Sequence, residues 1–89
     1  MKIKSNYVLQ EVVDEYIVVP IGEEADRLHG VLKLNAVGAF IWKILSNGVD
    51  SEEEIKKLIM DEYNIDKFTA EQDITMFLKQ LNEFGCLEY

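Results

Sequence analysis

The stretch that decides the expected fold is "VLKLNAVGAFIWKIL", residues 31–45, because its hydrophobic pattern changes once along its length. Residues 31–34 alternate between two faces, as in a β-strand. Asn35 follows, and asparagine is favoured as the N-cap of a helix. Beyond it the apolar residues have the spacing of an amphipathic helix and share one face: Val37, Phe40, Ile41, Ile44 and Leu45. We therefore predict a short strand over 29–34 and then a helix that ends near Leu45.

Two residues of this helix have particular packing roles. Gly38 lacks a side chain, so we expect another element to approach the helix closely at that point. Trp42 lies about 100° round the helical wheel from Ile41, at the rim of the apolar face. We expect its ring to seal the junction between helix and sheet there.

Upstream, the sequence predicts an antiparallel hairpin. The segments "YVLQEVV" and "EYIVVPI" are rich in β-branched and aromatic residues, and Asp14-Glu15 suits a tight connection between strands 7–13 and 15–20. Pro20 has no N–H to donate, so it should end the second strand or lie at an edge. The polar segment "GEEADRLHG", residues 22–30, is expected to form a loop.

Two further helices follow "SNG", in which Gly48 suits a left-handed position after the first helix. The second helix opens at Ser51, with Glu54 three residues later as the partner of a capping box. Its expected buried residues are Ile55, Leu58, Ile59 and Tyr63.

The third helix opens at Thr69, and Gln72 completes a second capping box. Gly85 is expected to end this helix, and the tail "CLEY" is expected to lie against the sheet. The apolar residues of the helix are Ile74, Phe77, Leu78, Leu81 and Phe84.

The predicted order is β-β-β-α-α-α in one domain over residues 1–89. A three-stranded antiparallel sheet is too small to be covered on both faces, so it should pack one face on the three helices as a winged-helix-like α+β domain. No apolar run approaches the ~20 residues of a membrane span, and the N-terminus lacks the apolar region of a secretory signal. The single cysteine, Cys86, fits a reducing compartment. We expect a cytoplasmic monomer.

The charge is unevenly distributed and argues against two classes of partner. The chain has a net charge of −8, and residues 46–89, with eleven acids and four bases, contribute −7 of it. Such a surface repels nucleic acid and anionic lipid. A winged helix that binds DNA would need basic contacts on its third helix, but residues 70–84 offer only Lys79 against three acids. We expect neither nucleic acid nor membrane as a partner.

The residues that usually carry catalysis are sparse. His29 is the only histidine, and no spacing typical of metal ligands is present. Cys86 follows the C-terminus of a helix, where the dipole raises the pKa of a thiol. The glycines are scattered, so no phosphate-binding loop is formed. We predict a protein that is not an enzyme and has no metal or cofactor.

A binding surface is the remaining possibility. If the third strand lies at the edge of the sheet, its unpaired backbone groups can accept an extended peptide as an added strand. Beside it, Phe77 and Phe84 lie at the edge of the apolar stripe of the third helix, and Met76 lies outside it. These side chains could line an apolar cleft. Alternatively, both phenylalanines are simply buried and Met76 is an incidental surface residue.

The chain resembles the PqqD-like family of small peptide-chaperone domains, also called RiPP recognition elements. The resemblance covers nearly the whole chain. A closing hydrophobic helix followed by Gly85 and Leu87 supports it. It is strongest in an L-N-x-x-G-x-x-I-W pattern, at Leu34, Asn35, Gly38, Ile41 and Trp42.

The resemblance implies a non-catalytic protein that binds the leader segment of a ribosomally made precursor peptide and presents it to a separate modifying enzyme, often a radical S-adenosylmethionine enzyme. In the family the leader lies as an extra strand against the third strand, with its side chains in the groove formed with the third helix. The positions that this implies here are Gly30, Val31, Leu32, Lys33, Leu34, Asp73, Met76, Phe77, Gln80, Leu81 and Phe84.

Two other functions stay open at this stage. One is an accessory or regulatory subunit that docks on an enzyme through its acidic helical half without binding peptide. The other is a DNA-binding winged helix, which the charge disfavours. The sequence does not identify the precursor, its product or the partner enzyme.

Overall fold

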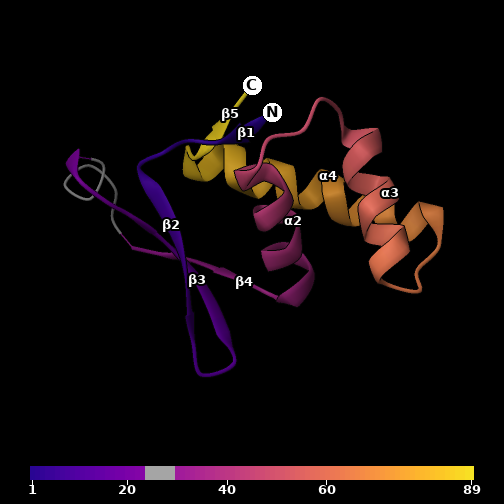
Figure 1. Cartoon of the computed structure of the whole chain (residues 1–89). Helices are drawn as coiled ribbons and strands as arrows, with labels where there is room; N and C mark the ends of the chain where they lie inside the picture. The colour runs from indigo at the N-terminus through magenta and orange to yellow at the C-terminus, as the bar shows by residue number, and fades with distance from the viewer. Residues whose placement is uncertain (24–29) are drawn as a thin grey trace.

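The structure is a computed structural model that describes residues 1–23 and 30–89. A three-stranded antiparallel sheet is followed by three helices, as predicted for an α+β fold, and α2 lies between the sheet and α3 (Figure 1). In chain order the elements are β1 (Lys2–Ile3), β2 (Tyr7–Val12), β3 (Glu15–Pro20), β4 (Leu32–Leu34), α2 (Ala36–Ser46), α3 (Glu52–Glu62), α4 (Lys67–Phe84) and β5 (Leu87–Glu88).

The main sheet has the strand order β2-β3-β4, which places β4 at an edge. Ile17 of β3 pairs with Lys33 at the centre of β4. This strand is shorter than the predicted 29–34. Gly30 has a φ of +96°, a left-handed conformation that does not continue a strand, and Val31 also precedes the paired residues. His29 lies outside the described residues.

The turn of the β2–β3 hairpin lies one residue earlier than predicted. Val12 pairs with Glu15, so the turn consists of Val13 and Asp14, whose φ angles are 33° and 62°. A two-residue hairpin turn of type I′ requires positive φ at both central positions. Asp14 tolerates that conformation, whereas a β-branched residue such as Val13 rarely adopts it. Pro20 ends β3, as expected.

Helix α2 begins as predicted, but it buries a different face. The Asn35 side chain accepts a hydrogen bond from the Gly38 N–H at 2.8 Å and caps the helix. Trp42 is only 4% exposed, so the prediction of a rim position was wrong. Helix α2 is covered on more than one side, so more than one face of it is buried. On the side of α3, the ring of Phe40 contacts that of Tyr63, the C-cap of α3, edge to face with the ring centroids 5.5 Å apart. The buried residues of α2 are Gly38, Ala39, Ile41, Trp42 and Leu45.

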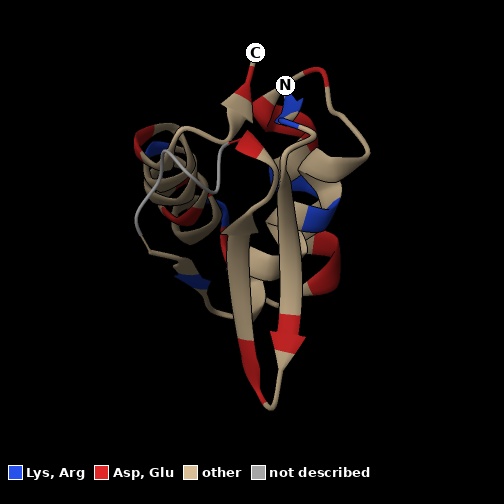
Figure 2. Cartoon of the chain, turned by 90° about the vertical axis from the view of Figure 1, so that its left-hand side faces the viewer, with Lys and Arg blue, Asp and Glu red and all other residues tan. Residues whose placement is uncertain are grey.

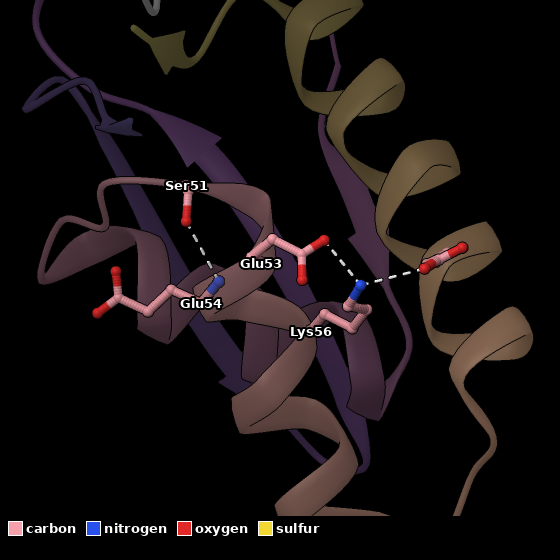
Figure 3. Close-up of polar contacts among 5 residues, drawn as sticks. Ser51, Glu53, Glu54 and Lys56 are labelled. Carbon is pink, nitrogen blue, oxygen red and sulfur yellow. Dashed lines mark hydrogen bonds and ion pairs between the residues drawn. The ribbon is translucent and has the colours of Figure 1, made fainter.

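The N-terminus of α3 is capped by Ser51, as predicted, and its side chain accepts from the Glu54 N–H at 3.4 Å (Figure 3). The capping box is not reciprocal, because the Glu54 carboxylate accepts from the Asp50 N–H instead. Ile55 and Ile59 are buried as expected.

Lys56 is buried in α3, whereas Leu58, which was expected to be buried, is 40% exposed. The ammonium of Lys56 lies 2.7 Å from Glu53 and 3.1 Å from Glu71 of α4 (Figure 3). These hydrogen bonds, first that to Glu53, raise the pKa of Lys56. Because its charge is paired at the contact between α3 and α4, Lys56 can be buried at this position.

Helix α4 begins at Lys67, earlier than predicted, because Asp66 rather than Thr69 is its N-cap. The Asp66 carboxylate accepts from the Thr69 N–H at 2.7 Å, and this bond holds the pKa of Asp66 below its usual range. Gly85 ends the helix with a φ of +88°, as predicted.

The two ends of the chain meet in a second small sheet, which the sequence did not predict. Ile3 of β1 pairs with Leu87 of β5, so the tail forms its strand pairing with β1 and not with the three-stranded sheet. The Met1 amine also donates to the Val49 carbonyl at 2.9 Å, and the Val49 N–H donates back to the Met1 carbonyl. Strands of two residues leave too little pattern to be recognised in a sequence.

The sheet and helices share one hydrophobic core, which includes Val18 from β3, Leu45 from α2 and Leu81 from α4. Residues 24–29 aside, the chain has no helix long and apolar enough to cross a membrane.

Candidate functional site

The outer edge of β4 is the first component of the candidate site. In the described parts of the chain β4 pairs only with β3, and its other side has no strand partner. An edge strand leaves N–H and C=O groups along one side that can bond to another chain.

A cavity of about 210 Å³ lies beside this edge, between β4, α2 and α4. Ten residues line it: Lys33, Leu34, Asn35, Val37, Gly38, Ile41, Asp73, Met76, Phe77 and Gln80. The edge strand and the hollow are therefore parts of one surface.

The close approach of α2 and α4 shapes this cavity. A Cβ on Gly38 would lie 3.0 Å from Cε1 of Phe77, so the missing side chain makes room for the ring, as expected for this glycine. Phe77 is only 6% exposed, whereas Met76 is 69% exposed. The ring thus forms a fixed floor of the cavity, and the flexible thioether lies at its mouth.

The structure brings six of the eleven predicted site residues together around the cavity: Lys33, Leu34, Asp73, Met76, Phe77 and Gln80. Gly30, Val31 and Leu32 lie in β4 or directly before it and do not line the cavity.

The other two predicted site residues lie away from the cavity. Leu81 is fully buried in the core, and the ring of Phe84 lies edge to face against Tyr7 at 5.9 Å. Neither lines the cavity. Asn35, Val37, Gly38 and Ile41 were missed as site residues, although the absent side chain of Gly38 had indicated a close contact on α2.

The walls of the cavity carry opposite charges. Lys33 lies on the β4 side and is 3.7 Å from Glu15 of β3, but both side chains are largely exposed and this pair is weak. Asp73 lies on the α4 side and is half-buried. The β2–β3 hairpin extends away from the helices with acidic residues near its turn (Figure 2). The site offers one basic and one acidic contact around an apolar floor.

Cys86 has the environment of a structural thiol. It is buried, its Sγ lies 3.6 Å from the Leu81 carbonyl, and burial raises the pKa of the thiol to about 11. Over residues 1–23 and 30–89, no group of three or more His, Cys, Asp or Glu side chains is placed to hold a metal ion.

Comparisons with known proteins identify a family and two similar structures. The family described as "Coenzyme PQQ synthesis protein D (PqqD)" matches residues 15–87. The solved structure "TbiB1 in Complex with the TbiA(beta) Leader Peptide" is 33% identical, with a TM-score of 0.77 over 99% of this chain and 95% of that chain. "Lasso peptide synthetase B1 complexed with the leader peptide" shares the fold at 20% identity, with a TM-score of 0.73 over 96% and 93% of the two chains. No curated protein matches the chain.

Proposed function

This chain belongs to the PqqD family, and we propose that it binds the leader segment of a ribosomally synthesised precursor peptide without catalysing a reaction itself. The observation that carries the proposal is the unpartnered edge of β4 beside the cavity formed with α4. The 33% identical TbiB1, whose structure contains a leader peptide, supports it.

The leader would bind by strand addition to β4. Backbone hydrogen bonds to an edge strand hold an extended peptide whatever its sequence, and alternate side chains then select the partner through pockets. Here one set of leader side chains would enter the cavity above Phe77, beside Met76. Exposed ion pairs with Lys33 or Asp73 would each add only about 0.2–1 kcal/mol, so the apolar contacts dominate the affinity.

Binding in this manner leaves the rest of the precursor accessible to a separate enzyme. We propose that the chain presents the leader-bound precursor to a modifying enzyme in the cytoplasm, and a radical S-adenosylmethionine enzyme is consistent with the family. The role of the chain would be to raise the concentration of precursor near that enzyme.

Calorimetry with a synthetic leader tests this proposal. The probes are the leader segment of a precursor encoded beside this gene and the TbiA(beta) leader peptide. Because Met76 is exposed at the cavity mouth, Met76→Glu should weaken binding at least about tenfold through the burial of a charge, while the circular dichroism spectrum stays unchanged. Phe77→Ala should weaken it as well through the loss of the floor.

Met60→Glu is the matched control, since Met60 lies on α3 and does not line the cavity. Equal affinity of the wild type, Met76→Glu and Phe77→Ala for the leader would show that the cavity is not the site. Capture of the modifying enzyme that is equally strong with and without leader would instead indicate an accessory subunit that works without peptide.

A further inference from the structure

A second hollow lies on the outer face of α4 and shares one residue with the cavity beside β4. Its volume is about 360 Å³. Met76 lines both hollows, so the two lie next to each other on either side of this side chain. The residues of the second hollow are Phe68, Glu71, Gln72, Thr75 and Met76.

Phe68 is the main apolar group of this hollow. It lies in the first turn of α4 and is 67% exposed, which is comparable to Met76. The N-cap bond from the Thr69 N–H to Asp66 fixes the start of the helix and with it the position of the Phe68 backbone. Large apolar side chains that are exposed next to one another mark a contact surface more often than isolated ones do.

The charge beside Phe68 is already compensated. Glu71, the only acid that lines the hollow, lies 3.1 Å from the buried ammonium of Lys56. Lys56 is held in turn by Glu53, as Figure 3 shows. An apolar side chain can therefore enter the hollow without leaving an unpaired carboxylate next to it.

A short extended segment of peptide can span the separation of Phe68 and Met76. Phe68 and Met76 are eight residues apart on one helix, which corresponds to about 12 Å along its axis. An extended chain advances about 3.3 Å per residue, so three or four residues span that distance. A leader that leaves the β4 edge along the N-terminal half of α4 would therefore reach Phe68 within three or four residues.

We propose that Phe68 forms the centre of a second subsite, which takes an apolar leader side chain three or four positions away from the one that contacts Met76. The inference rests on the proposed function and extends it. Because Met76 borders both hollows, a leader that occupies the first lies next to the second, which favours the leader itself, rather than another protein, as the occupant.

A mutant cycle between protein and peptide tests the subsite. The probe is the synthetic leader of the precursor encoded beside this gene, together with versions in which each apolar residue is changed to alanine in turn. Phe68→Ala should weaken the binding of the unmodified leader about five- to thirtyfold, as expected for the loss of an interface anchor. With one of the alanine peptides, Phe68→Ala should cause no further loss of affinity, which identifies the leader residue that contacts Phe68. A parallel cycle with Met76→Ala should identify the leader residue that contacts Met76, three or four positions away.

Met60→Ala is the control for an exposed apolar residue elsewhere and should bind every peptide like the wild type. If Phe68→Ala binds all peptides like the wild type while Met76→Glu is weakened, the subsite is refuted and the proposed function stands. If Phe68→Ala impairs only capture of the modifying enzyme, the occupant is that enzyme and the inference is wrong. If the wild type binds no leader, the proposed function itself has failed.

Discussion

Single residues determine the floor and the boundary of the candidate site. Gly38 allows the ring of Phe77 to reach α2, and Asn35 turns the chain from β4 into that helix by accepting the Gly38 N–H. Both residues act through their size or their hydrogen bonds rather than through reactivity. Cys86, the single cysteine, is buried and does not line the cavity.

The Cys86 thiol should be inert in the folded protein. Its pKa is raised from 9.0 to about 11 by burial, so at a pH below 9 the thiolate fraction is about a hundredfold smaller than in the unfolded chain. We expect its reaction with Ellman's reagent to be slower in buffer than in concentrated urea by at least that factor. The same shift stabilises the fold below pH 9, and this contribution is lost as the pH rises toward 11. Equal rates in buffer and in urea would contradict the burial.

At the scale of elements, the edge of β4 and the start of α4 decide what the site can bind. Strand β4 has only three paired residues. Helix α4 lines the cavity beside β4 with one face and the second hollow with the adjacent face. The two elements can be tested separately, because the edge of β4 acts through its backbone donors and the start of α4 depends on a helix cap.

Val31→Pro should abolish strand addition. Val31 precedes the residues of β4 that pair with β3, so a proline there removes a backbone donor and fixes φ next to the edge without replacing a paired residue. We expect loss of leader binding by calorimetry with an unchanged circular dichroism spectrum. Val31→Ala shortens the side chain but keeps the N–H, so it should bind the leader far more tightly than the proline variant. Tight binding by the proline variant would show that the leader does not add to this edge.

Asp66→Ala should destabilise the protein in a pH-dependent way. The pKa of Asp66 is lowered, chiefly by the hydrogen bond from the Thr69 N–H, so its carboxylate stabilises the fold at pH values above its ordinary pKa. This contribution is lost as the pH falls through the lowered pKa. In urea unfolding, the difference between Asp66→Ala and the wild type should therefore shrink as the solution is acidified.

Asp66→Asn is the control for this prediction. Its amide oxygen can still accept from the Thr69 N–H, so it should cap α4 without titrating. A difference between wild type and Asp66→Ala that stays constant with pH would show that the carboxylate charge does not contribute.

At the scale of the whole molecule, the two ends of the chain close the structure opposite the hairpin turn (Figure 1). The pairing of β1 with β5 covers Leu87 and Cys86, and the contacts of Met1 with Val49 attach the same sheet to the segment between α2 and α3. The candidate site beside β4 is lined by none of these residues, so we expect this pairing to affect binding only through stability.

Leu87→Ala should lower the free energy of unfolding by about 2–5 kcal/mol, because the side chain is 5% exposed and its loss leaves a cavity in the core. Urea unfolding measures this change. Tyr89→Ala is the control, since Tyr89 is largely exposed and its substitution should change the free energy by less than about 0.5 kcal/mol. Equal stability of both variants would mean that the tail does not pack as described.

The sequence by itself determined the features that depend on neighbours in the chain. The caps at Asn35 and Ser51 and the left-handed end at Gly85 were predicted, since a helix end is satisfied by groups within a few residues. The hairpin and the three helices followed from hydrophobic periodicity for the same reason.

Only the tertiary structure decided which faces are buried and which groups meet. The burial of Trp42, the exposure of Leu58 and the pairing of β1 with β5 depend on elements far away in the chain. So does the separation of Phe77 on the cavity floor from Leu81 in the core, although both lie on the same predicted stripe. A periodic pattern gives the direction of an apolar face, but the side chains that lie across from it come from residues that no local pattern can specify.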